Sequence, residues 1–232
     1  MSHKYKIVGF DADDTLWVNE PYFRETEMEF CRLMKDFVPE EELTAMLFQI
    51  EMQNLALYGY GIKAFALSLI ETALKVGNHQ LSCGIMENII RLGKDLLNKP
   101  VILLDGIETI LSKMENNGTR LIVVTKGDLL DQERKLAKSG IDKYFHHVEI
   151  MSDKRETDYQ KLLSRLGVAP ADFLMIGNSL KSDVIPVLNI GGSAIHIPYH
   201  TTWQHESNIQ AEQHHKYTEI SHIDELINIL DL

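Results

Sequence analysis

The sequence predicts an α/β protein in which a doubly wound parallel sheet carries an inserted, all-helical domain. Two patterns indicate this fold class. After residue 97, short apolar runs alternate with helical segments, which is typical of a parallel sheet with helices on both faces. Residues 20–97 instead show helical patterns without a convincing strand. We therefore expect residues 1–19 and 98–232 to form the sheet domain, and residues 20–97 to form an insert after the first strand.

Each expected strand is a short apolar run, and the expected helices between the later strands end at or near a glycine that suits a helix C-terminus. The expected strands are Tyr5–Phe10, Arg120–Thr125, His147–Met151, Phe173–Gly177 and Ser193–Ile197. The expected helices of the sheet domain are Gly106–Asn117, Asp128–Ser139, Glu156–Leu166 and Ser182–Ile190. Those of the insert are Tyr22–Lys35, Glu40–Leu57, Ile62–Lys75 and Cys83–Leu97, with Ser82 as an N-cap.

Composition narrows the classes of partner. The 232 residues carry 34 acidic side chains against 23 Lys and Arg, a net charge of −11. Such a balance argues against nucleic acid and acidic membranes as partners, because both attract clustered positive charge. The chain shows neither a signal-peptide pattern nor an apolar run of about 20 residues, so we expect a cytoplasmic protein. Cys31 and Cys83 are expected to be buried free thiols, with a disulfide left open. The oligomeric state also stays open.

Polar residues gather where the expected strands end. Asp11 and Asp13 follow the first apolar run. A charged side chain at the end of a buried strand is costly, so two acids there indicate a functional role. The second strand ends at Thr125-Lys126-Gly127, a turn that can bind phosphate oxygens through a hydroxyl and main-chain N–H groups. Because the carboxyl ends of parallel strands meet at one edge, these residues should converge there. Two further strand ends add to the set, with Lys154 after the third and Gly177-Asn178 with Asp183 after the fourth.

Each of these residues alone has an ordinary explanation as a turn, a helix cap or a surface charge. Together they supply a nucleophile, a proton carrier, phosphate donors and hard oxygen ligands. The set resembles the motifs of the haloacid dehalogenase superfamily of hydrolases. Asp11-x-Asp13-x-Thr15 resembles the first motif and Thr125 the second. Lys154 resembles the third motif, and Gly177-Asn178 with Asp183 resembles the acidic fourth. The resemblance covers essentially the whole chain.

This resemblance implies a Rossmann-like core, a helical C1-type cap and, most often, Mg²⁺-dependent hydrolysis of a phosphate ester. It implies that Asp11 attacks phosphorus and that Asp13 moves the protons. Thr125, the N–H of Lys126, and Lys154 would hold the phosphate oxygens. The expected Mg²⁺ ligands are the Asp11 carboxylate, the Asp13 main-chain carbonyl, Asn178 and Asp183.

Two departures from the family pattern stand out. Asn178 replaces the usual aspartate of the fourth motif and brings less charge to the metal, while Asp14 stands where glycine is frequent. Asp13 favours a phosphatase over a haloacid dehalogenase, which needs neither that second acid nor Mg²⁺. A phosphotransferase or sugar-phosphate mutase would share every core residue, and a non-enzymatic binding module has only Asn178 in its favour.

Specificity is expected to lie in the insert. Within Tyr58-Gly59-Tyr60-Gly61-Ile62-Lys63, the glycines permit a tight turn that presents Tyr60 and Lys63 to the substrate, although a plain helix–helix loop explains it equally well. Residues that follow the first motif are expected to line the entrance, namely Trp17, Asn19, Glu20 and Tyr22. The substrate is expected to be a small phosphorylated metabolite such as a sugar phosphate, a nucleoside monophosphate or a phosphoglycolate-like acid.

Overall fold

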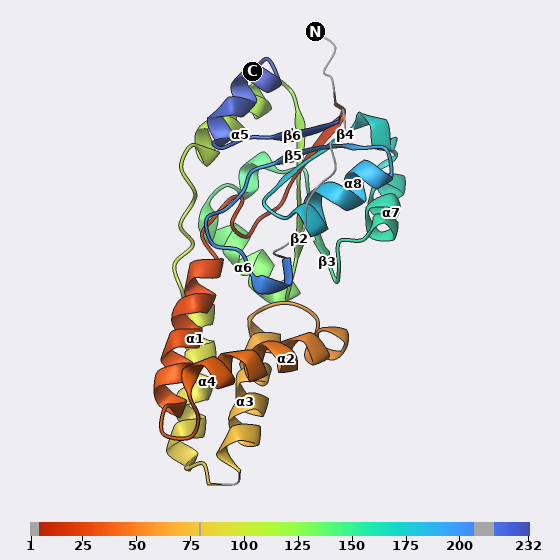
Figure 1. Cartoon of the computed structure of the whole chain (residues 1–232). Coiled ribbons are helices and arrows are strands. Elements are labelled where there is room, and N and C mark those ends of the chain that lie inside the picture. The colour runs from red at the N-terminus through yellow and green to blue at the C-terminus, as the bar shows by residue number, and fades with distance from the viewer. Residues whose placement is uncertain (1–4, 79, 207–215) are drawn as a thin grey trace. The chain divides into compact units, whose positions relative to one another are not determined.

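The computed structural model describes residues 5–78, 80–206 and 216–232. By its internal contacts the chain divides into two compact units, and Figure 1 labels most of their helices and strands. The sheet unit comprises the residues up to Glu20, Val101–Lys126 and the residues from Gln132 onward. The helical unit comprises Pro21–Pro100 together with Gly127–Asp131.

The sheet unit is built on six parallel strands in the order β3-β2-β1-β4-β5-β6, which confirms the predicted fold class. The strands are β1 Ile7–Phe10, β2 Arg120–Lys126, β3 His147–Met151, β4 Phe173–Gly177, β5 Ser193–His196 and β6 Tyr217–Glu219. Strand β1 lies between β2 and β4, with Phe10 paired to Val123 and to Ile176. Strand β6 was not predicted, because its three residues are too short to show a periodic pattern.

Helices flank this sheet. They are α5 Ile107–Asn116, α6 Leu129–Ser139, α7 Glu156–Leu166, α8 Ile185–Asn189 and α9 Leu226–Ile229, and the first residues of α6 fall in the helical unit. Short single turns are η1 Asp142–Tyr144, η2 Pro170–Asp172, η3 Leu180–Val184, η4 Gln204–Glu206 and η5 Ile223–Glu225. The expected helix Ser182–Ile190 is wrong in its first three residues, which belong to the wider π-helical turn η3 before α8 begins at Ile185.

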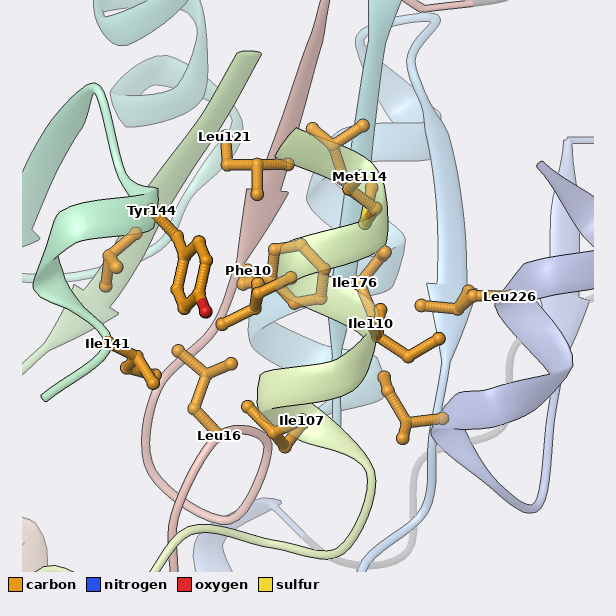
Figure 2. Packing of buried hydrophobic residues seen from close by; sticks show 14 of the residues in the cluster. Phe10, Leu16, Ile107, Ile110, Met114, Leu121, Ile141, Tyr144, Ile176 and Leu226 are labelled. Atoms are coloured by element: carbon orange, nitrogen blue, oxygen red, sulfur yellow. The ribbon is translucent and has the colours of Figure 1, made fainter. Parts of the chain in front are cut away.

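The two faces of the sheet have separate cores. On one face, Ile107, Ile110 and Met114 of α5 pack against Phe10 and Ile176, as Figure 2 shows. On the other face, α7 and α8 pack against alternate residues of the same strands. This second core contains Ile7, Ile122, Val124, Tyr159, Leu162, Leu163, Phe173, Met175 and Val187. Burial on both faces explains why the strands read as continuous apolar runs.

The helical unit contains α1 Glu20–Met34, α2 Glu40–Tyr58, α3 Ile62–Gly77 and α4 Cys83–Leu97, in agreement with the predicted helices to within a few residues. Its own core includes Phe30, Leu43, Leu47, Leu69 and Ile89. The Ser82 side chain accepts a hydrogen bond from the N–H of Ile85, which confirms the predicted N-cap. Cys31 is buried, but Cys83 is exposed, so the predicted burial of the second thiol is wrong. Both thiols are free.

None of the helices in the described part of the chain has the length and apolar character that a membrane crossing requires.

Candidate active site

Three charged side chains from three strand ends meet in the interior of the sheet unit. Asp11 follows β1, Lys154 follows β3 and Asp183 lies in η3 after β4. The Lys154 ammonium donates to a carboxylate oxygen of Asp11 and, at 2.6 Å, to Oδ1 of Asp183. All three are buried, Lys154 and Asp183 almost completely. The parallel sheet therefore brings together residues that lie up to 172 positions apart in the chain, as the strand-end pattern predicted.

This buried cluster holds one cation against two carboxylates. Burial raises the pKa of Asp11 to about 7; Lys154 opposes this rise, and Asp183 adds to it. Burial disfavours the charged form of Lys154, yet the two carboxylates raise its pKa above the usual range. The ammonium is thus fully compensated, whereas the two carboxylates share a single positive charge.

Thr15 links Asp11 to the fourth motif. Its hydroxyl lies 3.2 Å from Oδ2 of Asp11 and 3.2 Å from Oδ1 of Asn178, and it shares one proton between these two acceptors. The main-chain carbonyl of Asn178 accepts a hydrogen bond from Nε2 of His196 on β5, at 3.0 Å. The other ring nitrogen of His196 pairs with the Glu219 carboxylate on β6. Asn178 is therefore held both through its side chain and through its backbone.

Gly177 is required by the close approach of Asp183. The N–H of Ser179 donates to Oδ2 of Asp183 at 3.0 Å, which folds the carboxylate back over the end of β4. A Cβ atom at position 177 would lie 2.3 Å from that same oxygen. The absence of a side chain at Gly177 thus lets Asp183 turn toward Lys154.

Asp13 lies outside this cluster and has its own set of donors. Its Oδ1 accepts hydrogen bonds from Nε1 of Trp17 at 2.7 Å and from Nζ of Lys135 at 2.6 Å. Its Oδ2 accepts one from Nε2 of Gln132 at 2.9 Å. The carboxylate is three-quarters buried, and a cation, an indole and an amide fix its orientation. The sequence placed Trp17 at the entrance of the site, but its side chain is buried and helps to hold Asp13.

Two residues of α6 were missed by the sequence analysis. Gln132 and Lys135 lie three positions apart on α6 and therefore on one helix face. Gln132 donates from the same nitrogen to Asp13 and to the main-chain carbonyl of Lys126, at 2.8 Å. A polar residue on a helix face gives no sign in the sequence that this face meets a carboxylate.

Thr125 and Lys126 end β2. The buried Thr125 hydroxyl donates to the carbonyl of Lys126 at 3.3 Å. The Lys126 ammonium donates to Oγ of Ser182 at 2.8 Å and to Oε1 of Glu206 at 2.5 Å. Burial alone would raise the pKa of Glu206, but Lys126 and the hydroxyls of Ser179 and Ser182 lower it to about 2. The side chain of Lys126 is therefore paired within the sheet unit.

Asp14 adopts a left-handed backbone conformation with φ of 59°, which explains why glycine suits this position. Its carboxylate accepts hydrogen bonds from the N–H groups of Asn19 and Glu20 at the start of α1. Burial nevertheless raises the pKa of Asp14 to about 8, because desolvation outweighs these hydrogen bonds.

The predicted substrate residues Tyr60 and Lys63 belong to the helical unit. The Lys63 ammonium lies 2.9 and 3.0 Å from the two carboxylate oxygens of Asp128, a residue of the same unit. Gly61 has a φ of 111° and lies close to the main chain of Asp128, so the turn conformation expected of the two glycines is present. The roles of Tyr60 and Lys63 toward a substrate stay predictions.

The donor set next to Lys154 fits a hard divalent cation. Among the described residues, no three His, Cys, Asp or Glu side chains gather as a metal site. The predicted Mg²⁺ ligands include only two carboxylates, those of Asp11 and Asp183. The amide oxygen of Asn178 and the main-chain carbonyl of Asp13 complete the set. Lys154 compensates only one of the two negative charges on this buried carboxylate pair. A cation that prefers oxygen ligands would balance the other.

Comparisons with known proteins identify the family and the fold. The sequence profile of the haloacid dehalogenase-like hydrolases matches residues 5–191. A haloacid dehalogenase-like family hydrolase from Xanthomonas campestris superposes with a TM-score of 0.86 at 31% identity, covering 99% of this chain and 93% of that structure.

Two curated relatives are more distant in sequence. The N-acylneuraminate-9-phosphatase of Homo sapiens is 23% identical over 89% of this chain and 85% of its own length. The glyceraldehyde 3-phosphate phosphatase of Methanothermobacter thermautotrophicus is 28% identical over 82% of this chain and 84% of its own length. With the profile match and the 31% identical structure, the chain belongs to the haloacid dehalogenase-like hydrolase family.

Proposed function

We propose that this hydrolase is a Mg²⁺-dependent phosphatase that cleaves a small phosphorylated metabolite through an aspartyl-phosphate intermediate. The observation that carries the proposal is the difference between two acids that lie two residues apart. Asp11 is buried against Lys154, as a positioned nucleophile requires. Asp13 is more exposed and is held by three donors from Trp17, Gln132 and Lys135, as a proton carrier requires.

In the first step, a carboxylate oxygen of Asp11 attacks phosphorus while the ester oxygen leaves and takes a proton from Asp13. In the second step, Asp13 removes a proton from water, and the resulting oxygen attacks the aspartyl phosphate. The P–O bond to Asp11 breaks, so Asp11 is regenerated and inorganic phosphate is released. The donors around Asp13 keep its carboxyl group in one orientation through both proton transfers.

Charge on the transferring phosphoryl group would be balanced by this chain's own donors. Lys154 contacts Asp11 and would also neutralise an oxygen of a phosphoryl group bound there. Thr125, with the N–H of Lys126, supplies neutral donors, since the ammonium of Lys126 is paired with Glu206. Mg²⁺, held by Asp11, the carbonyl of Asp13, Asn178 and Asp183, would supply the positive charge that brings a dianionic phosphate next to Asp11.

The names of the curated relatives support this reaction class, because the human and the Methanothermobacter proteins are both called phosphatases of small phosphorylated metabolites. Their identities of 23% and 28% leave this chain's own substrate to be found by experiment. We further propose that residues 1–19 and 98–232 form the catalytic core and that residues 20–97 act as a cap that selects the substrate. The division of the chain into a sheet unit and a helical unit supports these roles.

A panel of phosphorylated metabolites tests the proposal, with release of inorganic phosphate measured with and without Mg²⁺. The panel includes triose phosphates, sugar phosphates, nucleoside monophosphates and phosphoglycolate, with chloroacetate as a dehalogenase substrate. We expect Mg²⁺-dependent phosphate release from at least one ester and no halide release. Asp11→Asn should remove turnover and leave the fold intact, because the substitution keeps the shape of the side chain and removes the nucleophilic oxygen.

Three results would contradict the proposal. Undiminished turnover by Asp11→Asn would remove the assigned nucleophile. Halide release without Mg²⁺ would favour the dehalogenase. Transfer of the phosphoryl group to a sugar, in place of water, would favour the mutase.

A further inference from the structure

A carboxylate from the C-terminal part of the chain lies against the end of β2. Glu206 is the last residue of η4, and its side chain is 14% exposed. Its Oε1 accepts hydrogen bonds from Nζ of Lys126 at 2.5 Å and from Oγ of Ser182 at 2.9 Å. The Ser179 hydroxyl is a further donor to the same carboxylate. One ammonium and two hydroxyls thus form a complete anion-binding site, which the protein fills with its own side chain.

The three donors belong to the same segments as the proposed catalytic residues. Lys126 directly follows Thr125, Ser179 directly follows Asn178, and Ser182 directly precedes Asp183. The contact between Lys126 and Ser182 joins the end of β2 to the turn after β4, and β1 with Asp11 lies between these strands. The anion site is therefore a neighbour of the position at which Asp11 would receive the phosphoryl group.

We infer that Lys126, Ser179 and Ser182 form a second anion subsite beside the phosphate, and that Glu206 occupies it so that the enzyme selects substrates without a second negative charge near the ester. This inference rests on the proposed function for the position of the ester. It deepens that function by naming a substrate class, which is phosphate monoesters whose neighbouring group is an uncharged hydroxyl or carbonyl. Phosphorylated acids and bisphosphates with closely spaced charges belong to the rejected class.

The physical reason is the local charge. Glu206 neutralises Lys126 and accepts from both hydroxyls, so an incoming carboxylate would find these three donors already used and would face a like charge. Lys181 is a second cation nearby, and its ammonium lies 2.6 Å from Nε2 of His205 on the same segment as Glu206. Glu206 also interacts with Lys181, so adding Lys126→Met to the Glu206→Gln variant is needed to separate the effect of Lys126 from that of Lys181.

A matched pair of substrates tests the inference. Glycerol 3-phosphate and 3-phosphoglycerate have the same carbon skeleton, and the second replaces a hydroxymethyl group by a carboxylate. In the wild-type enzyme we expect kcat/KM to be at least about tenfold higher for glycerol 3-phosphate. In Glu206→Gln the ratio of the two values should shift toward 3-phosphoglycerate by about tenfold or more, because Lys126 then has no anionic partner. Adding Lys126→Met to this variant should cancel the shift.

Glu149→Gln is the matched control. Glu149 is a paired carboxylate with a side chain that is 15% exposed, but it lies on β3 with Arg165 as its partner. Glu149→Gln should leave the ratio of kcat/KM for the two substrates at the wild-type value. Calorimetric binding of the same two compounds to Asp11→Asn, with and without Glu206→Gln, gives a readout without turnover.

The outcomes separate this inference from the proposed function. If no ester is hydrolysed by the wild-type enzyme, the proposed function fails and the binding comparison still decides the subsite. A wild-type preference for 3-phosphoglycerate would overturn the inference. It would also be overturned if Glu206→Gln left both the kinetic and the binding ratio unchanged.

Discussion

The buried carboxyl group of Asp14 should make the stability of the protein depend on pH in a defined direction. Its pKa is raised from 3.8 to about 8 by burial. The folded protein therefore keeps a proton on Asp14 that the unfolded chain has already released between about pH 4 and pH 8. Because the folded state binds more protons in this range, the free energy of unfolding falls as the pH rises.

The size of the effect follows from the shift. At pH 7 the distance from the ordinary value of 3.8 is about three units, which corresponds to about 4 kcal/mol at 1.36 kcal/mol per unit. Asp14→Asn removes this penalty, and asparagine also tolerates the left-handed φ of 59°. It keeps one oxygen for the N–H groups of Asn19 and Glu20 but loses the other, at a cost of about 1–2 kcal/mol. We expect a net gain of about 2–3 kcal/mol near pH 7. Near pH 4 the penalty has almost vanished, so the lost hydrogen bond should leave a net loss of about 1 kcal/mol.

Urea unfolding in EDTA buffer measures this difference across that pH range. Asp231→Asn is the control, because Asp231 has a similar left-handed φ of 54° but is exposed. The control should follow the wild-type curve at every pH. An Asp14→Asn curve that runs parallel to the wild-type curve from pH 4 to pH 8 would refute the assigned penalty.

Three further predictions concern the site itself. Lys154→Met leaves two buried carboxylates without their cation, so urea unfolding at neutral pH should show a loss of about 3–5 kcal/mol together with lost turnover; wild-type stability would contradict the ion cluster. Lys135→Met removes a donor from Asp13 and should lower kcat by about tenfold or more with little change in KM, and an effect on KM alone would show that it acts on binding instead. Asn178→Asp adds a carboxylate to the proposed metal ligands, so a Mg²⁺ titration of activity should reach half-saturation at a lower concentration; an unchanged titration would place position 178 outside the metal shell.

Much of the fold could be predicted because its signals are local. Apolar runs, helical periods and glycines at helix ends gave five strands and most helices with small errors at their ends. The failures have physical causes. Strand β6 is too short for a pattern. The π-helical turn at Leu180–Val184 contains a hydrogen bond from the N–H of Ser179 to the Asp183 carboxylate, a contact with no sequence signature.

The convergence of the candidate site was also predictable. Parallel strands must end at one edge, so Asp11, Lys154 and Asp183 could be expected to meet although they are far apart in sequence. The hydrogen-bond partners of Asp13 could not be predicted in the same way. The face of α6 that carries Gln132 and Lys135 is polar like many solvent-facing helix surfaces, and only packing against the sheet turns it toward Asp13.

The sequence by itself determined the fold class, the strand ends that carry chemistry and the family to which the chain belongs. Tertiary structure alone decided which charges are compensated. Lys154 serves two carboxylates, Lys126 is paired with Glu206, and the buried Asp14 carboxylate accepts hydrogen bonds from main-chain N–H groups. The reason is that the backbone pattern is encoded by local periodicity, whereas the strength of an electrostatic interaction depends on distance and burial, which are fixed only when distant segments pack together.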